Sequence, residues 1–323
     1  MNTGLALARS RGYALLGDLY SHGLTERSLA AWRQAPAGVL AAPDASVDLE
    51  ATAEAHTSLF LIELPPLESA FCAPDGLLGG EVTDAVRRAR AHAGLGDPLD
   101  EEPDHLGAEL SWLAFLTGAE ADARRDAVDA TRILELQREA LDQHLLRWIP
   151  QLVTALSGFS EGGIGDEGAD AMYVRGARLA QDLILDHRLA VGGTTPVWSL
   201  PATVAVLEDP RTGLRGIAEH LCLPCQAGGY LTRTAITRLS RSLDLPMTFG
   251  ARPDLLEGLF CAAAQYDRIP DLCTALDTVL GTWDAGYAAS PASGPWCDRV
   301  ATTRGMLDRL ARASRSGGGA TRP

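Results

Sequence analysis

Lysine is missing from this sequence, and all 28 of its basic residues are arginine. The absence of lysine excludes a phosphate-binding loop of the Gly-x-x-x-x-Gly-Lys type. The 42 acidic residues outnumber the arginines and give a formal net charge of -14. Such an acidic balance argues against nonspecific binding to nucleic acid and against attraction to anionic lipid, and it suits a basic or neutral partner.

Cysteine and long apolar runs are also scarce. Six cysteines at irregular spacing in 323 residues are too few for a disulfide-built scaffold. No stretch approaches the roughly 18 to 20 consecutive apolar residues that a membrane span requires. The N-terminal stretch contains Arg9 and Arg11, but neither an uninterrupted apolar core nor a small-residue cleavage site, so it does not resemble a signal peptide. We therefore expect a soluble, cytoplasmic protein with reduced thiols.

Apolar residues recur at helical spacing along almost the whole chain, whereas alternation with a period of two is scarce. The sequence therefore predicts an all-α fold. The expected helices lie at residues 5–20, 25–34, 47–62, 82–94, 104–117, 122–156, 170–190, 212–221, 231–243, 252–264, 268–286 and 296–313.

Glycine- and proline-rich stretches divide the chain. The strongest breaks are "GFSEGGIGDEG" (158–168) and "VGGTTPVWSLP" (191–201), and the end of the chain has the composition of a disordered tail. We expect a main helical domain at residues 1–195, a helical extension at 196–313 and a disordered tail at 314–323. In the extension, Thr232 or Thr234 is a candidate helix cap, and Pro253 suits the first turn of a helix.

The segment 122–156 illustrates how the core is encoded. One stripe of apolar side chains follows helical spacing, and arginine and acidic residues occupy the opposite side. Pro150 lacks an amide hydrogen and its ring clashes with the preceding turn. The helix is therefore expected to kink or stop near Ile149.

The stretch "EEPDHLGAELSWLAFL" (101–116) combines an acidic cluster with an apolar helix. Asp104 is expected to cap that helix through its carboxylate. His105, Glu109 and Trp112 follow at helical spacing on one face, while a set of leucines occupies another face. A helix that is apolar on two sides is largely buried, so we expect His105 and Glu109 to form a satisfied pair in the core.

Two further stretches carry polar residues beside apolar ones. In "HLLRWIP" (144–150), His144 and Trp148 are one helical turn apart at the edge of the apolar stripe. In "LFLIELPPLES" (59–69), a helix ends in a Pro-Pro turn that is followed by Glu68 and Ser69. Taken singly, the first indicates a core histidine and the second a turn.

Together, these stretches resemble the TorD/DmsD/NarJ family of redox-enzyme maturation chaperones. The resemblance rests on "RGYALLGDLY", "LFLIELPPLES", "PDHLGAELSWLAFL", "HLLRWIP" and "YVRGARLA", in that order, and covers about residues 9 to 190. Three features depart from the family pattern: Leu67 replaces a large aromatic residue, extra sequence lies at about 117–133, and the chain continues for over a hundred residues past the usual end.

The resemblance implies a TorD-like helical bundle that binds the twin-arginine leader and the apo form of a molybdenum-containing oxidoreductase catalytic subunit, and delays its export until cofactor insertion. Such a leader is cationic and then apolar, so its receptor needs carboxylates beside an apolar groove. No catalytic residue and no bound cofactor are expected, and the protein is expected to be a monomer or homodimer. The residues expected to bind the client or to act as a hinge are Glu68, Ser69, Asp100, Glu101, Glu102, Asp104, His105, Glu109, Trp112, His144 and Trp148.

Two alternatives stay open. A metal-binding protein or enzyme would use His105, Glu109 and His144, although the Glu-x-x-His pattern of helical di-metal sites is absent. Cys222 and Cys225 form a Cys-x-x-Cys that suits either a thiol or metal site or two small side chains packed at a helix end. We prefer the packing interpretation, because neither a preceding strand nor a second cysteine pair is present.

Overall fold

The structure is a computed structural model of the chain. The residues that it describes are 2–34, 47–97, 101–160, 169–192, 198–209, 211–288, 290 and 293–317. These residues form helices and no strand, which confirms the predicted all-α class. The chain divides into two compact units, the first formed by residues 1–73 and 77–198 and the second by residues 199–323 with 74–76. The domain assignment made from the sequence stays a prediction.

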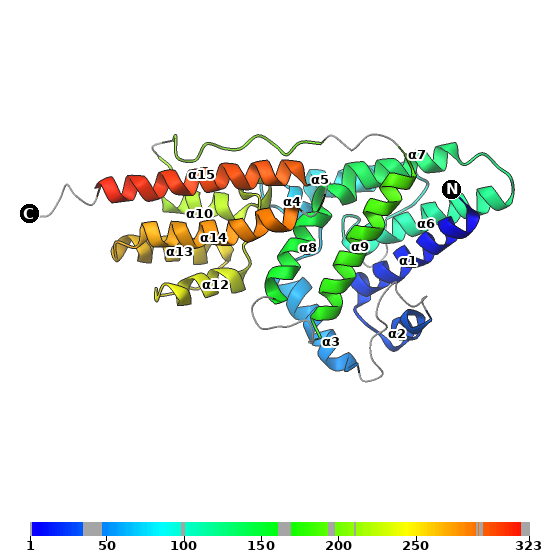
Figure 1. The fold of residues 1–323 in the computed structure, drawn as a ribbon, viewed down its shortest axis with the longest axis horizontal. Helices are drawn as coiled ribbons and strands as arrows, with labels where there is room; N and C mark the ends of the chain where they lie inside the picture. Colours follow the sequence, from blue (N-terminus) through cyan, green and yellow to red (C-terminus); the bar gives the residue numbers. More distant parts are fainter. Residues whose placement is uncertain are drawn as a thin grey trace, which may run out of the picture. The chain divides into compact units, whose positions relative to one another are not determined.

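The helices of the first unit are α1 (Thr3–His22), α2 (Glu26–Arg33), α3 (Leu49–His56), the π-helical η1 (Thr57–Glu63), α4 (Glu68–Cys72), α5 (Gly80–His92), α6 (Leu106–Arg125), α7 (Thr131–Ala140), the π-helical η2 (Leu141–Leu145), α8 (Leu146–Ser160) and α9 (Ala171–Ala190). Those of the second unit are α10 (Leu214–Cys222), α11 (Pro224–Ala227), α12 (Arg233–Ser242), α13 (Arg252–Gln265), α14 (Ile269–Ala288) and α15 (Gly294–Gly317) (Figure 1).

Helices α1 and α6 form the closest packing of the first unit and run side by side (Figure 1). Glycines make this approach possible. A Cβ added to Gly107 would lie 2.0 Å from Ser21 Oγ and 2.9 Å from the carbonyl oxygen of Gly17. Farther along the pair, the Ser10 hydroxyl donates to the carbonyl of Ala114 at 2.8 Å. The two helix backbones therefore pack in direct contact, with no room for a larger side chain between them.

An aromatic cluster joins α1, η1 and α9. The ring of Phe60 meets those of Tyr20 and Tyr173 edge-on at centroid distances of 5.5 Å and 5.4 Å. The Tyr20 hydroxyl donates to the carbonyl of Tyr173 at 2.7 Å, and the Tyr173 hydroxyl donates to the carbonyl of Thr52 at 2.9 Å. Both tyrosines thus bury their rings and satisfy their hydroxyls, as buried tyrosine requires.

A buried chain of hydrogen bonds crosses α1, α9, α7 and α6. His187 lies 3.0 Å from the Tyr13 hydroxyl through Nδ1 and 3.0 Å from Gln137 Oε1 through Nε2. Because an amide oxygen only accepts, Nε2 must carry the proton and Tyr13 must donate to Nδ1. The Gln137 amide then donates to Glu120, which also accepts from Arg124 at 2.7 Å. Burial lowers the pKa of His187 to about 3, so the imidazole ring stays neutral within this series of hydrogen bonds.

The break expected between residues 117 and 122 is absent. Helix α6 continues to Arg125, and the chain turns at residues 126–130, where Ala127 has a φ of 55°. The Thr117 hydroxyl donates to the carbonyl of Leu113 at 2.7 Å within the helix. A threonine can remain inside a helix when its hydroxyl donates to a carbonyl of the preceding turn. The sequence pattern does not distinguish such a threonine from one that ends a helix.

Of the kink or stop predicted near Ile149, the stop is wrong and the kink stays a prediction. Helix α8 runs through Pro150 to Ser160, and the irregularity lies one turn earlier, in the π-helical segment η2. Proline in a helix removes one amide donor and crowds the preceding turn, and π-helical turns are among the features that accompany such distortions. The break predicted at 158–168 falls mostly on residues 161–168, which lie outside the described residues.

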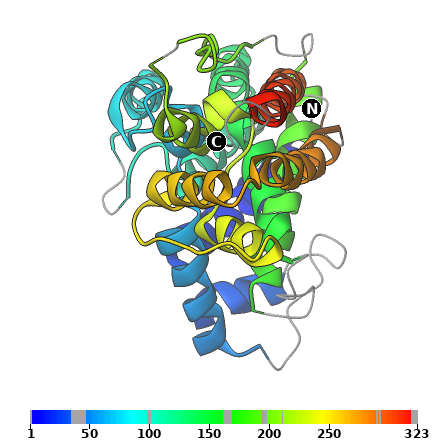
Figure 2. The same cartoon turned by 90° about the vertical axis from the view of Figure 1, so that its left-hand side faces the viewer.

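In the second unit, α14 (orange) and α15 (red) run side by side in both views (Figures 1 and 2). Thr232 caps α12 by accepting from the amide of Ala235 at 3.0 Å, and Pro253 occupies the first turn of α13, as predicted. Helix α15 extends to Gly317 and therefore into the segment expected to be disordered. Residues 318–323 lie outside the described part of the chain.

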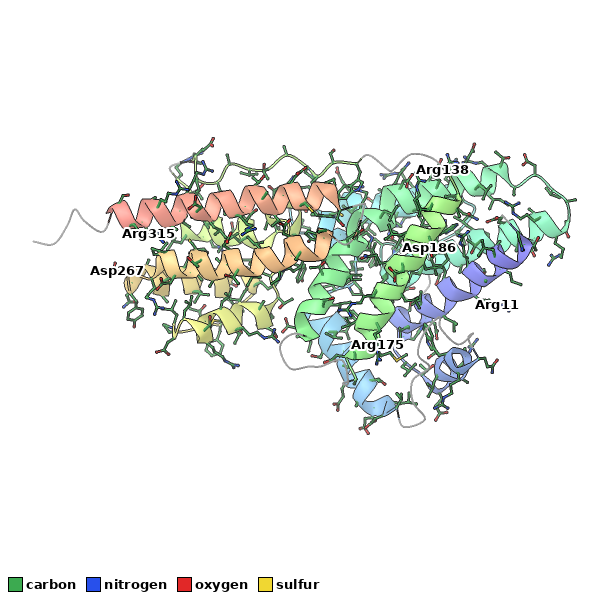
Figure 3. The ribbon with its side chains drawn as sticks, in the orientation of Figure 1. Arg11, Arg138, Arg175, Asp186, Asp267 and Arg315 are labelled. Carbon is green, nitrogen blue, oxygen red and sulfur yellow. The ribbon has the colours of Figure 1, made fainter. Side chains whose placement is uncertain are left out.

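Charged side chains cover the outer faces of the helices. Arg175 and Asp186, for example, project from α9 into solvent, and Arg11 does so from α1 (Figure 3). Within the described ranges, no helix has both the length and the apolar character needed to cross a membrane.

Candidate functional site

Two motif segments far apart in sequence meet before α4 and α6 begin. An isolated antiparallel bridge joins Leu67 to His105. The amide of Leu106 donates to the carbonyl of Pro66 at 2.8 Å. The amide of Glu68 donates to the carbonyl of Asp104 at 2.9 Å. A residue before proline prefers extended backbone, so the Pro-Pro turn presents its carbonyls for this pairing. The bridge brings the starts of the two helices together.

Asp104 caps a different helix from the one predicted. Its Oδ2 accepts from the amide of Ser69 at 2.9 Å, in the first turn of α4, and its side chain is fully buried. The residue at the N-cap position of α6 is His105. The bridge explains the correction, because it places Asp104 across from the open amides of α4.

His105 pairs with Glu101 and not with the expected Glu109. The distance from His105 Nδ1 to Glu101 Oε2 is 2.7 Å. The Ser21 hydroxyl of α1 also lies 2.8 Å from the same carboxylate oxygen. Burial raises the pKa of Glu101, but the hydrogen bonds from His105 and Ser21 outweigh burial and hold the pKa below its usual value. Glu101 is therefore a charged tie between α1 and the start of α6.

The buried histidine–glutamate pair of this site is His144 with Glu68. His144 Nδ1 lies 2.9 Å from Glu68 Oε2, and both side chains are at most 5% exposed. Arg147 approaches the other oxygen of Glu68 at 3.9 Å. The His144 ring also packs against Trp112 with a centroid distance of 5.8 Å. This pair links α4 to η2. Because both side chains are buried, water cannot take the place of a lost partner.

Glu109 meets the indole of Trp148. The Trp148 Nε1–H group donates to Glu109 Oε2 at 3.4 Å, and both side chains are fully buried. The other face of the site is aromatic, because Phe71 of α4 stacks on Trp148 at 5.5 Å and 27°. Helices α4, α6 and α8 are thus joined around one indole.

Glu109 carries the strongest electrostatic perturbation of the site. Burial raises its pKa well above the usual value, and the neighbouring carboxylates of Glu68 and Asp104 raise it further. The hydrogen bond from Trp148 and the charge of Arg90 act in the opposite direction without reversing the shift. A buried carboxyl group among like charges holds its proton more strongly than an exposed one.

Three buried polar atoms of the site have no hydrogen-bond partner among the described residues: Asp104 Oδ1, Glu109 Oε1 and Trp112 Nε1. Buried polar atoms are almost always paired, and an unpaired one costs about 1 to 3 kcal/mol. The site is therefore less completely satisfied than an ordinary core.

We predict that Glu109→Gln removes a pH-dependent loss of folding stability. The folded state retains a proton that the unfolded chain releases above its ordinary pKa of 4.5, so wild-type stability should fall as the pH rises from 5 to 8. The glutamine variant lacks this loss, so its stability should depend less on pH and should exceed that of the wild type at pH 8. Thermal unfolding followed by circular dichroism at both pH values measures it.

Glu120→Gln is the matched control, because Glu120 is equally buried but is paired with Arg124 and Gln137. This variant should be less stable than the wild type at both pH values. A parallel response of Glu109→Gln and wild type to pH would contradict the assignment.

Most of the predicted client-binding residues are interior residues. Those with at most 4% exposure are Glu68, Ser69, Asp104, Glu109, Trp112, His144 and Trp148. Of the remaining acidic residues expected to bind the client, Glu102 is exposed, Glu101 is partly buried, and Asp100 lies outside the described residues. The buried members hold α4, α6 and α8 together, and a role of this set in client binding stays a prediction.

The two alternatives receive no geometric support. His105, Glu109 and His144 each pair with a different neighbour, and in the described part of the chain no three His, Cys, Asp or Glu side chains are grouped so that they could hold a metal ion. Cys222 and Cys225 are buried and form no disulfide, and burial raises the pKa of each thiol to about 11. A thiol with so high a pKa is a poor nucleophile near neutral pH.

Sequence reasoning missed Phe71 and Arg90. Phe71 follows the Glu-Ser pair by two residues, and a search of that motif for aromatic neighbours would have found it. Arg90 is buried and donates to the carbonyl of Ala108 at 2.8 Å. No pattern in α5 distinguishes this arginine from its exposed neighbours, because its role depends on the position of α6.

Comparisons with known proteins match part of the chain. The family model described as "Nitrate reductase delta subunit" matches residues 25–154. A selenate reductase assembly chaperone protein from Thauera selenatis is 33% identical over 104 residues, which are 32% of this chain and 49% of the relative. A chlorate reductase assembly chaperone protein from Ideonella dechloratans is 32% identical over 92 residues, which are 28% of this chain and 42% of the relative. The chain thus spans at most about half the length of these curated relatives, and no solved structure matches it significantly.

Proposed function

We propose that this chain is a cytoplasmic, non-enzymatic assembly chaperone for a molybdenum-containing oxidoreductase, because its residues 25–154 match the family model and two relatives named as assembly chaperones resemble part of the chain. The observation that carries this proposal is the extent of the family match, which contains every residue of the predicted site. The finer proposal is that the chain binds the twin-arginine leader and the apo catalytic subunit, and delays export until the cofactor is inserted.

The distribution of charge supports a cationic client segment. Residues 1–73 and 77–198, which form the first unit, contain 29 of the 42 acidic residues and 15 of the 28 arginines. The first unit therefore has a strong negative field that draws a basic peptide towards it and repels acidic competitors. Charge of this kind mainly accelerates association and supplies specificity, so apolar contacts must supply much of the affinity.

Exposed apolar side chains beside α4 are the candidates for those contacts. Leu77 and Leu78 follow α4 and are 65% and 56% exposed. Their loop is tied to the buried site, because the Gly79 amide donates to the Ser69 hydroxyl at 3.1 Å. We propose that the apolar part of the leader packs on these leucines while its arginines face the acidic surface that includes Glu102.

A synthetic leader peptide with two adjacent arginines and a following apolar segment tests the finer proposal. Its affinity, measured by fluorescence anisotropy, should fall at least about tenfold between low and high salt, because exposed charges are screened. Glu102→Arg should weaken binding several-fold. Reversal of Glu101 or Asp104 is a poor test, because both carboxylates also hold the fold together.

The double change Leu77→Ser and Leu78→Ser should weaken the peptide about tenfold or more, as expected for the loss of buried leucine contacts. Leu189→Ser is the matched control, because Leu189 is 80% exposed on α9. Equal affinities for the double variant and the control would contradict the proposed contact surface.

A further inference from the structure

The second unit contains a hollow of about 430 Å³ along α13. Its floor consists of small side chains at helical spacing, namely Gly258, Cys261 and Ala262. Met247 and Phe249, from the segment after α12, also line it. A floor of small residues beside larger apolar ones has the form of a groove for side chains of another polypeptide.

Phe249 is the most exposed apolar side chain described in the chain, at 99%. Its segment is nevertheless held against α13. The Thr248 hydroxyl donates to the carbonyl of Asp254 at 3.1 Å, and a Cβ on Gly258 would lie only 2.3 Å from Thr248 Oγ1. Covering a phenylalanine side chain removes a large apolar surface from water and therefore favours binding. A ring presented to solvent by an anchored segment is therefore available to a partner.

The N-terminal end of the hollow is acidic. Arg215 is bonded to three carboxylates, those of Glu219, Asp254 and Glu257. One guanidinium neutralises one of these charges, so the cluster keeps two net negative charges. Asp254 and Glu257 line the hollow itself. The hydrogen bond from Arg215 lowers the pKa of Asp254, which keeps this carboxylate ionised.

We propose that this hollow is a second docking site, for a segment of another protein that carries arginine or lysine within about one helical turn of large apolar side chains. The apolar side chains would cover Phe249 and fill the floor, and the cation would approach Glu257. A second copy of this chain is a poor occupant, because two copies meeting face to face would oppose two negative clusters. The inference does not depend on the assembly role proposed above.

Two fluorescein-labelled synthetic peptides of equal charge test this site on the full chain. The first combines arginines with a leucine- and phenylalanine-rich face, and the second has serine in place of every apolar residue. The first should bind at least about tenfold more tightly. Phe249→Ser should remove most of that difference, and Cys261→Trp, which fills the floor, should do the same. Glu257→Gln should weaken the first peptide and reduce its salt dependence.

Tyr266→Ser is the matched control, because Tyr266 is 56% exposed but does not line the hollow. It should leave both affinities unchanged. Equal binding of the two peptides, no binding of the first, or equal effects of Phe249→Ser and Tyr266→Ser would overturn the proposal. So would binding of the first peptide that is lost with the Leu77 and Leu78 changes and kept in Phe249→Ser, because it would locate the peptide on the first unit.

Discussion

Replacing His144 with alanine should lower the free energy of unfolding by about 3 to 5 kcal/mol. The substitution leaves the Glu68 carboxylate buried without its 2.9 Å partner, and the remaining Arg147 contact at 3.9 Å is too long for a hydrogen bond. It also opens a cavity beside Trp112, whose ring packs on the imidazole. Urea denaturation followed by tryptophan fluorescence measures the loss.

His22→Ala is the control for this prediction. His22 and Asp18 form a pair of similar length, 3.1 Å, but their side chains are 62% and 42% exposed. An exposed pair contributes at most about 1 kcal/mol, so the control should be nearly neutral. A loss in His144→Ala no larger than that in His22→Ala would show that the buried pair does not hold α4 to η2.

Gly107→Ala should cost about 3 kcal/mol, although alanine normally favours a helix over glycine by about 1 kcal/mol. The added methyl group would lie 2.0 Å from Ser21 Oγ and 2.9 Å from the carbonyl oxygen of Gly17, so α1 and α6 must separate. A backbone carbonyl cannot move away from the added methyl group as easily as a flexible side chain can. Thermal unfolding of the variant should show the loss as a clearly lower melting temperature.

Gly118→Ala tests the same helix pair at a less crowded position. A Cβ there would meet Ser10 Oγ at 3.3 Å, a distance that a small side-chain movement relieves. This variant should be neutral or slightly more stable than wild type. If both alanine variants behaved alike, the close α1–α6 approach would not be a determinant of stability.

Helical periodicity predicted most of the fold because it depends on local spacing. The burial of the helix that begins near residue 104 followed from apolar side chains on two faces. The cap at Thr232 and the first-turn position of Pro253 followed from their own short motifs. Each of these features is decided within a few residues. The π-helical segment η2, which precedes α8, was missed because it carries no turn signal in the sequence.

Part of the membership of the candidate site was predictable from the sequence, but its pairing was not. The sequence identified Asp104, Glu109 and His144, yet each has a partner that no local spacing indicates. Asp104 reaches Ser69 through a two-segment bridge, and His144 reaches Glu68 from another helix. Spacing within one helix favoured His105 with Glu109, whereas the tertiary arrangement placed Glu101 closer to His105.

The burial of this set changes how its variants should be interpreted. If variants of His144 or Trp148 lose client binding, the first explanation is a loss of packing between α4, α6 and α8. Loss of a direct contact with the client is the second explanation. Variants of exposed residues such as Leu77, Leu78 and Glu102 separate binding from folding, because their side chains make little contribution to the interior.

Reconstitution with a client tests the assembly role most directly. The catalytic subunit of a molybdenum-containing oxidoreductase from the same host is produced with and without this chain, and complex formation and molybdenum content are measured. We predict that the apo subunit co-purifies with the chain, that it gains molybdenum only when the chain is present, and that the Leu77 and Leu78 double variant loses both effects. A subunit that acquires its full molybdenum content without this chain, and forms no complex with it, would contradict the account.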